Sequence, residues 1–396
     1  MDIPQKNLLT GYEILERLRT NTPQDYTNLI RKNKHPFLPL LIISYSKTCN
    51  FCSPFDPSWD DLTLGCRGII INTETEEIWS KPWNKFFNFD PDIHHHDISK
   101  NSYTLEKLDG SLGISYRDPF TGKVRISTKG SFTSPMAVWA TDVWLATRDW
   151  IPEDVFDQNL TYLFEIIYPE QRGKDGSMTL VDYGNVSECF LIGIIDTKTG
   201  EEFHWNFVSE FANRYGIKTP KKYDFKEFGE ILSKTKELPW NDEGYVVTLP
   251  DNNFYKYKLK GQEYCRIHRT IFSFGTRAIW CLLRDKKYNF PEILSNIPFD
   301  AKREKLNIYY KIIDEANSII ESWRRKAYKL YDRKLTRKEL AIKIQQGTTS
   351  KKEMGIVFNI LDDYDGSGFE KLFYKALKEI EEKYKQKPKN IEEEEC

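Results

Sequence analysis

The feature that most constrains the fold of this chain is a change in its hydrophobic period about two thirds of the way along. From about residue 36 to 262, apolar residues occur in short runs such as RGIIIN, YLFEIIY, CFLIGIID and GYVVTL, separated by Gly, Pro, Asn and Asp. Such runs are typical of β-strands, and their close spacing favours antiparallel sheets. From about residue 263 the period becomes helical, with long amphipathic stretches. The sequence therefore predicts an α+β body built on antiparallel sheets, followed by helices.

The same change predicts where the domains begin and end. The N-terminal stretch 1–35 has Leu, Tyr and Ile at helical spacing, so we expect it to be helical before the strands begin. The sequence after about residue 262 does not contain the five short apolar runs that would predict a small β-barrel. The predicted parts are a sheet-rich domain over 1–262, an all-α basic domain over 263–390 and an acidic tail over 391–396.

Charge is almost balanced overall but unevenly distributed. The chain has 58 Lys and Arg against 59 Asp and Glu. Residues 1–261 contain 30 basic and 37 acidic residues, whereas residues 262–390 contain 28 basic and 18 acidic ones. A basic C-terminal third suggests a polyanionic partner such as a nucleic acid. A set of solvated, lysine-rich helices is the alternative, and charge alone does not separate the two.

Composition limits the compartment and argues against several kinds of site. No apolar run approaches the roughly 18 residues needed to span a bilayer, and the first residues lack a signal-peptide pattern, so we expect a cytoplasmic protein. Seven scattered cysteines do not suggest a disulfide framework. The pair Cys49 and Cys52 lacks a second pair for zinc. The run His94–His96 is best interpreted as an exposed loop.

The stretch EKLDGSLG at 106–113 has two interpretations. Asp109 and Gly110 form a strong hairpin signal, because both tolerate positive φ. Lys107 could then be a solvated charge beside a tight turn. The alternative is that Lys107 performs the chemistry. The stretch alone favours the hairpin, so the choice depends on the rest of the chain.

Four further stretches place charged residues in apolar strands. Arg67 begins RGIIIN, and Glu165 and Glu243 lie within or just before apolar runs, where an unpaired carboxylate would be costly. In FYKYKLK the lysines alternate with Tyr and Leu, so they share one face of a strand. Each stretch has a structural explanation, such as a buried ion pair or a charged edge strand. The alternating lysines are Lys256, Lys258 and Lys260.

One reaction uses all of these groups, namely nucleotidyl transfer through a lysine. The lysine amine attacks the α-phosphorus of a nucleoside triphosphate and displaces pyrophosphate. Lysine has an unperturbed pKa near 10.4, so burial and nearby cations must lower that pKa to expose the lone pair. The same cations stabilise the charged transition state, and a carboxylate is needed to hold magnesium.

The order of these motifs, KxDG, then an acid, then EG, then KxK, resembles the covalent nucleotidyltransferase superfamily of ligases and capping enzymes. RGIIIN, NKFFNF and KLDGSLG in succession, followed by KLKGQEY, resemble the RNA ligases of the T-even phage tRNA-repair type. The resemblance covers roughly residues 40–265. It implies a nucleotidyltransferase (ligase adenylation) fold, ATP with magnesium or manganese, and RNA with 5′-phosphate and 3′-hydroxyl ends.

The resemblance also implies roles for individual residues. Lys107 would carry the adenylate, Glu165 would contact the ribose and Glu243 would hold the metal, with Asp109 orienting the turn or a metal-bound water. Lys258 and Lys260 would contact the α-phosphate, although Lys256 leaves the register of the KxK pair open; Tyr264 favours the later pair. Phe190 is a weak candidate for stacking on adenine and is better explained as a core residue. The remaining nucleotide contacts would be Arg67, Lys85, Glu106 and Lys129.

Two alternatives remain open beside the ligase. A capping-type nucleotidyltransferase would use GTP, and an RNA-binding protein could keep the fold without activity. The absence of a predicted C-terminal barrel argues against DNA ligases and capping enzymes. Possible partners implied by the resemblance are tRNA and a polynucleotide kinase acting upstream, in the host cytoplasm if the chain is phage-encoded.

Overall fold

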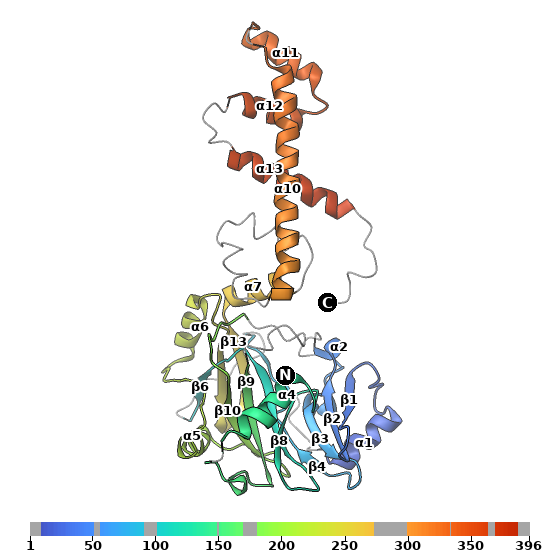
Figure 1. Ribbon diagram of the computed structural model, residues 1–396, viewed down its shortest axis with the longest axis vertical. Helices are drawn as coiled ribbons and strands as arrows, with labels where there is room; N and C mark the ends of the chain where they lie inside the picture. The colour runs from blue at the N-terminus through green and yellow to red at the C-terminus, as the bar shows by residue number, and fades with distance from the viewer. Residues whose placement is uncertain are drawn as a thin grey trace. The chain divides into compact units, whose positions relative to one another are not determined.

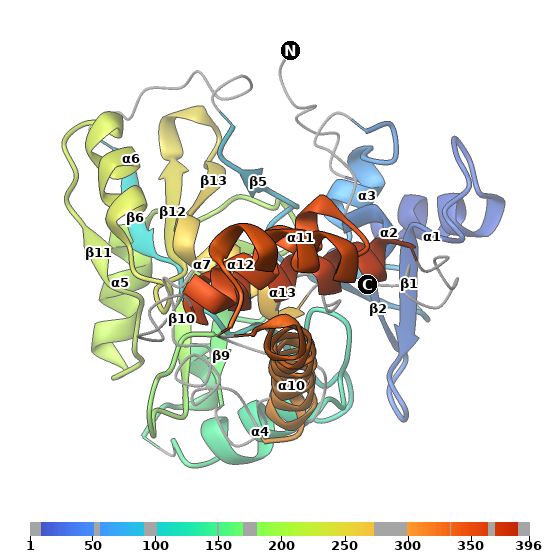
Figure 2. The same ribbon diagram turned by 90° about the horizontal axis from the view of Figure 1, so that it is seen from above.

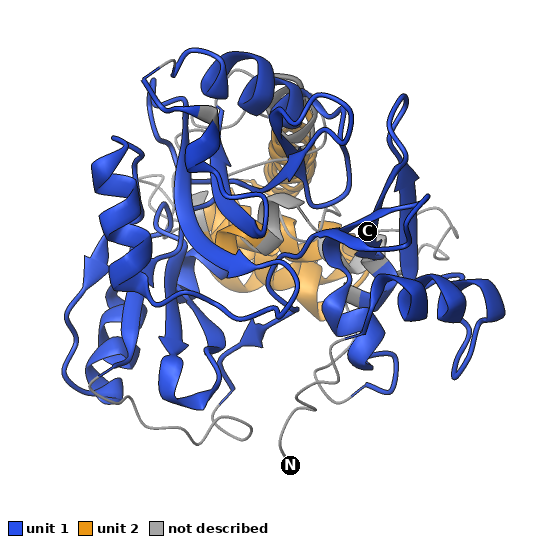
Figure 3. Ribbon diagram, turned by 90° about the horizontal axis from the view of Figure 1, so that it is seen from below, with its two compact units in different colours: residues 1–265 blue, residues 266–396 orange. Residues whose placement is uncertain are grey.

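The computed structural model separates into two compact units, Met1–Cys265 and Arg266–Cys396 (Figure 3). The sequence predicts the boundary after residue 262, within the helix α7 (Gln262–Phe272) that spans the division. The candidate residues His94–His96 and Cys52 and the acidic tail 391–396 lie outside the described residues. The structure describes residues 9–50, 56–90, 101–148, 150–168, 180–272, 299–332, 334–362 and 369–386.

The first sheet has four antiparallel strands in chain order. Helix α1 (Gly11–Thr20) begins with a capping box at Thr10 and buries Ile14, Leu15 and Leu18 against this sheet. The helical prediction for 1–35 is therefore only partly right, because β1 is a strand. The strands are β1 (Ile30–Lys34), β2 (Leu40–Tyr45), β3 (Arg67–Asn72) and β4 (Ile78–Ser80).

The second sheet has the order β10-β9-β7-β8 and is also antiparallel. Its core face packs against three helical segments, α4 (Pro135–Trp139), the π-helix η1 (Ala140–Leu145) and α5 (Trp205–Arg214). Figure 1 shows α4 and α5 beside these strands. The strands are β7 (Ser111–Arg117), β8 (Val124–Thr128), β9 (Leu160–Ile167) and β10 (Glu188–Asp196).

The third sheet has the order β11-β6-β12-β13-β5, antiparallel except for the β13–β5 pair. On β13 (Tyr255–Lys260), Tyr257 and Leu259 pack with Ile231 of α6 (Phe228–Glu237), so the alternating lysines occupy the opposite face. Figure 2 shows α6 alongside this sheet. The other strands are β5 (Phe87–Asn88), β6 (Tyr103–Glu106), β11 (Lys222–Tyr223) and β12 (Gly244–Leu249).

The turn at Asp109 and Gly110 does not close a hairpin. Strand β6 before it pairs with β11 and β12, whereas β7 after it pairs with β8 and β9. The turn therefore carries the chain from the third sheet to the second. This connection places Lys107 between two sheets instead of at a solvent-exposed hairpin tip.

The second unit is helical throughout its described residues. Its longest helix, α10 (Phe299–Leu330), buries Ile312, Ala316, Ile320 and Ala327, which follow the helical repeat. The prediction of antiparallel sheets followed by a helical C-terminal region is thus confirmed. None of the described helices is both long and apolar enough to cross a membrane. The other helices are α11 (Arg337–Gly347), α12 (Lys351–Asp362) and α13 (Phe369–Gln386).

Several short elements complete the first unit. Helix α3 ends where Arg67 begins β3, and it has a capping box at Asp60. Cys49 and Cys66 are buried, and the Cys49 thiol lies 3.9 Å from the Ser58 carbonyl oxygen. The short elements are α2 (Lys47–Asn50), α3 (Asp61–Gly65) and the turns of 3₁₀ helix η2 (Glu153–Val155) and η4 (Pro250–Asn252).

We predict that Gly244→Ala destabilises the protein strongly. Gly244 has φ +133°, and a Cβ there would lie 2.0 Å from the carbonyl oxygen of Leu259 on the paired strand. The strands would have to separate, so the thermal midpoint should fall by at least several degrees. Gly229 in α6 has open space around it, and Gly229→Ala should leave the midpoint unchanged or raise it. Equal midpoints for the two variants would contradict the prediction.

Candidate active site

Lys107 and Lys260 share one carboxylate, that of Glu243. Lys107 Nζ lies 2.6 Å from Glu243 Oε2, and Lys260 Nζ lies 2.8 Å from Glu243 Oε1. The Glu243 side chain is only 4% exposed, so this contact is shielded from water. The backbone fixes the arrangement, because the Lys107 amide donates to the Gly244 carbonyl at 2.8 Å. The structure thus brings together three residues that are far apart in the sequence.

The charges around Lys107 raise its pKa. Burial alone would lower that pKa, but the negative charges of Glu243 and Glu165 outweigh it. The same contacts lower the pKa of Glu243 despite its burial. The prediction that burial and cations lower the pKa of Lys107 is therefore wrong for the protein alone. The Lys107 amine could act as a nucleophile only if another group neutralised the negative charge of Glu243.

Glu165 lies on β9, opposite Phe190 on β10 and Leu112 on β7. Its Oε1 accepts a hydrogen bond from the Gly110 amide at 3.0 Å, which ties it to the turn after Lys107. Burial raises the pKa of Glu165 to about 7. Phe190, which the sequence favours as a core residue, is only partly buried and shares the face of Glu165.

The backbone amide and the side chain of Asp109 both form hydrogen bonds with distant parts of the chain. Its Oδ2 accepts hydrogen bonds from the Leu180 amide at 2.8 Å and the Val181 amide at 3.3 Å. The Asp109 amide donates to the hydroxyl oxygen of Tyr183 at 2.7 Å, and Tyr264 hydrogen-bonds to its side chain. These contacts match the orientation of the turn, which is one of the two uses that the sequence suggests for Asp109.

Arg67 and Lys258 share the ring of Phe86. The Arg67 guanidinium lies 5.0 Å from the ring centroid and Lys258 Nζ lies 4.6 Å from it. Burial and neighbouring cations, with Arg67 first among them, lower the pKa of Lys258 well below its usual value. Within the described residues neither side chain forms an ion pair, and Arg67 Nη1 is buried without a hydrogen-bond partner. These nitrogens are available to an anion.

Lys85 and Lys129 share a second ring, that of Tyr45. Lys85 Nζ lies 4.9 Å and Lys129 Nζ 4.2 Å from its centroid. Burial, together with the charge of Arg67, lowers the pKa of each lysine to about 8. Five cations therefore accompany Lys107 and Glu243, and this arrangement suits the binding of a triphosphate or pyrophosphate. They are Arg67, Lys85, Lys129, Lys258 and Lys260.

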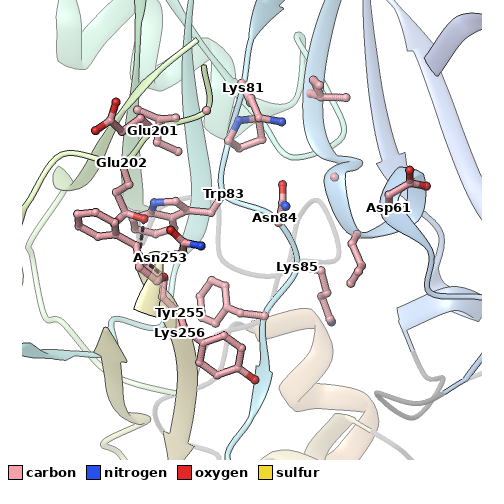
Figure 4. Close-up of a pocket in the computed structure, with 18 of the residues that line it drawn as sticks. Asp61, Lys81, Trp83, Asn84, Lys85, Glu201, Glu202, Asn253, Tyr255 and Lys256 are labelled. Carbon is pink, nitrogen blue, oxygen red and sulfur yellow. Dashed lines mark hydrogen bonds and ion pairs between the residues drawn. The ribbon is translucent and has the colours of Figure 1, made fainter. Parts of the chain in front are cut away.

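Lys256 has a different environment from the other two lysines of β13. It forms a buried ion pair with Glu202 beside Trp83, in the wall of a cavity of about 410 Å³ (Figure 4). The Lys256 and Glu202 side chains are 5% and 8% exposed. Lys258 and Lys260 face Phe86 and Glu243 instead. The later KxK pair is thus the one beside Lys107.

The remaining predicted residue, Glu106, lies at the edge of the same region. Its Oε2 accepts from the Lys221 amide at 3.3 Å. Glu106, Lys107, Tyr183 and Glu243 line a cavity of about 210 Å³. In the described residues there is no group of three His, Cys, Asp or Glu side chains that could hold a metal ion alone.

Four residues of this region are not predicted from the sequence. Phe86 is the neighbour of Lys85 in NKFFNF, so its position beside two cations could have been suspected. Tyr45, Tyr183 and Glu202 lie in unrelated stretches, and nothing local in the sequence connects them to Lys85, Asp109 or Lys256.

Comparison with known proteins agrees with the motifs. The family model described as RNA ligase matches residues 65–264, just over half of the chain. This range contains Arg67, Lys107, Glu165, Glu243 and both later lysines of β13. The chain belongs to the RNA ligase family. Its membership confirms the family resemblance inferred from the order of the motifs.

Two curated relatives are similar at modest identity. A protein of Autographa californica nuclear polyhedrosis virus, named as a candidate bifunctional polynucleotide kinase/RNA ligase, is 26% identical over 52% of this chain. The chain spans only 31% of that relative's length. A protein of Thermovibrio ammonificans, named as a candidate RNA ligase, is 25% identical over 67% of this chain and 69% of its own length.

Solved structures of RNA ligases also resemble the chain. An archaeal ATP-dependent RNA ligase covers 75% of each chain at 12% identity, with a TM-score of 0.45. An RNA ligase of Naegleria gruberi with pyrophosphate covers 42% of this chain and 51% of its own, at 18% identity and a TM-score of 0.33.

We predict opposite effects on stability for two lysines of one strand face. Lys256→Met leaves the buried Glu202 carboxylate without its cation, which should cost about 3–5 kcal/mol of unfolding free energy. Lys258→Met removes a cation surrounded by other cations and should leave stability unchanged or higher. Thermal denaturation of both variants tests this. A larger loss of stability in Lys258→Met would contradict the assigned environments.

Proposed function

We propose that the chain is an ATP-dependent RNA ligase that joins a 5′-phosphate to a 3′-hydroxyl through a lysyl-AMP at Lys107. The observation that carries this proposal is the convergence of Lys107, Glu243 and the cations on β3, β13 and the residues around them, within a chain of the RNA ligase family. Among the described residues, Arg67 Nη1 is buried without a hydrogen-bond partner, which fits a phosphate of a nucleotide.

In the first step, Lys107 Nζ bonds to the α-phosphorus of ATP while the bond to pyrophosphate breaks. The ammonium must first lose a proton, and a second proton leaves as the phosphoramidate forms. In this proposal Lys258 and Lys260 contact the α-phosphate, and Arg67, Lys85 and Lys129 hold the leaving pyrophosphate. Their charges stabilise the in-line transition state.

A divalent cation fits Glu243 better than any other carboxylate of the site. The pKa of Glu243 is lowered, so it is ionised at neutral pH, whereas burial raises the pKa of Glu165 and that of Asp109. Magnesium is often held by one or two carboxylates together with substrate phosphates. When bound there, the metal would neutralise Glu243 and so remove the main charge that keeps Lys107 protonated.

Two more displacements complete the reaction. A 5′-phosphate oxygen of RNA attacks the phosphorus of the lysyl-AMP, and Lys107 leaves as the amine. The 3′-hydroxyl of a second RNA end then attacks the 5′-phosphate and releases AMP. Glu165 is tied to the turn by the Gly110 amide, and in this proposal it hydrogen-bonds the ribose of the adenylate throughout.

The substrate and partners follow from the same chemistry. The viral relative carries polynucleotide kinase in its name, and a kinase would supply the 5′-phosphate that this reaction consumes. Broken tRNA is the substrate class that the motif resemblance favours, and a reaction that uses ATP and RNA suits the cytoplasm. The second unit, with 28 Lys and Arg against 21 Asp and Glu over residues 266–396, is suited to contact an RNA backbone.

We predict that Lys107→Ala abolishes lysyl-AMP formation but preserves the joining of pre-adenylated RNA. Loss of the nucleophile should reduce adenylation by at least about 10⁴-fold. Lys107→Arg keeps the ion pair with Glu243 but cannot lose its proton, so it should be equally unable to form the adduct. Incubation with α-labelled ATP and magnesium, followed by mass spectrometry, measures the adduct.

The same labelling experiment separates the competing functions. Label from GTP in preference to ATP would indicate a capping-type enzyme, and no label from either would indicate an RNA-binding protein without activity. Equal loss of adenylation and of pre-adenylated joining in Lys107→Ala would contradict the role given to Lys107.

We predict that the KM for ATP rises as the pH increases through about 8. Lys85 and Lys129 have pKa values of about 8 in the free protein, lowered from their usual range, so their charges are present below that pH and lost above it. Lys129→Arg keeps its charge at all these pH values and should show a shallower rise. Lysyl-AMP formation measured between pH 6.5 and 9.5 tests this, and identical profiles for the two proteins would refute it.

A further inference from the structure

Strand β1 is an exposed, basic edge of the first sheet. It is the terminal strand in the order β1-β2-β3-β4, and its residues from Arg31 to Lys34 are all exposed. The tip that follows carries Phe37, which is 88% exposed. Residues 26–55 contain no Asp or Glu, in a domain whose overall balance is acidic. An edge strand also presents unpaired backbone N–H groups.

This edge is continuous with the cations of the active site. Tyr45, whose ring lies beneath Lys85 and Lys129, ends β2 and pairs with Ile30 at the start of β1. Arg31 and Asn33 share one face of β1, and the Asn33 amide donates to the Gly130 carbonyl, next to Lys129. The charge of Arg31 also contributes to lowering the pKa of Lys129. Positive charge therefore extends from the pyrophosphate contacts onto β1.

The geometry of in-line displacement decides which RNA end lies there. Pyrophosphate leaves on the side opposite Lys107, and in the next step the attacking 5′-phosphate must approach opposite Lys107 as well. The 5′-phosphate therefore occupies the place that pyrophosphate has left, among Arg67, Lys85 and Lys129. Its strand must continue outward from these cations.

We propose, resting on the RNA ligase function above, that β1 and the tip at Phe37 bind the first nucleotides of the RNA strand that carries the 5′-phosphate. Arg31, on the same face of β1 as Asn33, and Lys32 and Lys34, on the opposite face, flank the free edge of β1 from both sides and contact the phosphates of the RNA. Phe37 stacks on a base. Strand β1 rises about 3.4 Å per residue, so Arg31 to Lys34 spans about 10 Å, enough for the nucleotides next to the end.

The competing explanation is that these charges only protect an edge strand from aggregation. The chain provides a matched control for it. Strand β11 is an edge strand of the third sheet. Lys222 on this strand is exposed, and so are Lys226 and Lys236, which lie nearby in sequence. Replacing these three lysines with alanine changes the net charge by the same amount as replacing Arg31, Lys32 and Lys34.

The test measures the binding of short single-stranded RNA by fluorescence anisotropy over a range of salt concentrations. One RNA has a 5′-phosphate and a blocked 3′ end; the other has a 5′-hydroxyl and a free 3′-hydroxyl. The triple variant Arg31→Ala/Lys32→Ala/Lys34→Ala should bind the first RNA at least about 10-fold more weakly, with a salt slope smaller by about 2. Phe37→Ala should weaken binding about 5-fold or more without changing the slope.

Lysyl-AMP formation is measured in every variant, because it uses the site but not the RNA. Normal adenylation with unchanged RNA binding in the β1 triple variant would overturn the inference and leave the ligase function intact. Equal weakening by Lys222→Ala/Lys226→Ala/Lys236→Ala, or equal weakening for both RNAs, would also overturn it. Absence of lysyl-AMP in the unaltered protein would instead refute the proposed function.

Discussion

The contact of Glu243 with Lys107 and Lys260 is the interaction on which the geometry of the site depends. It requires three neighbouring strands, β6, β12 and β13, to be in one register. The backbone supplies that register directly, since the Lys107 amide donates to the Gly244 carbonyl at 2.8 Å and the Gly261 amide donates to the Glu243 carbonyl at 3.0 Å. Gly244, with φ +133°, allows the close approach to Leu259. The positions of the charged side chains therefore follow from main-chain pairing.

The fold tolerates the other cations because aromatic rings lie beside them. Phe86 is shared by Arg67 and Lys258, and Tyr45 by Lys85 and Lys129, at 4.2–5.0 Å from the ring centroids. A ring face attracts a cation electrostatically without neutralising it. The lowered pKa values of the three lysines show that repulsion and burial persist. A bound anion would relieve the repulsion, so the free energy released when it binds would include repulsion already present in the folded protein.

Much of the fold and of the candidate site could be predicted from the sequence. The features that could not be predicted share one cause. The quoted apolar runs all form strands, and the acids inside them, Glu165 and Glu243, lie beside the KxDG turn as the motif order predicts. Strand β1, IRKNK, has no apolar alternation, so the pattern gave no sign of it. The contacts of Asp109 with Leu180 and Tyr183 and of Lys256 with Glu202 join segments about 50 to 75 residues apart. No local pattern encodes contacts of that kind, and the pKa of Lys107 depends on them.

The alternation of lysine and apolar residues on β13 also affects how the chain folds. A slip of one residue against β12 would turn Lys256, Lys258 and Lys260 toward Ile231 and expose Tyr257 and Leu259 to the cations. A misaligned chain would thus bury three ammonium groups among apolar side chains. Compact misfolded states with this register would therefore be unstable. The charged residues of β13 would therefore disfavour wrongly aligned sheets during folding, before any ligand binds.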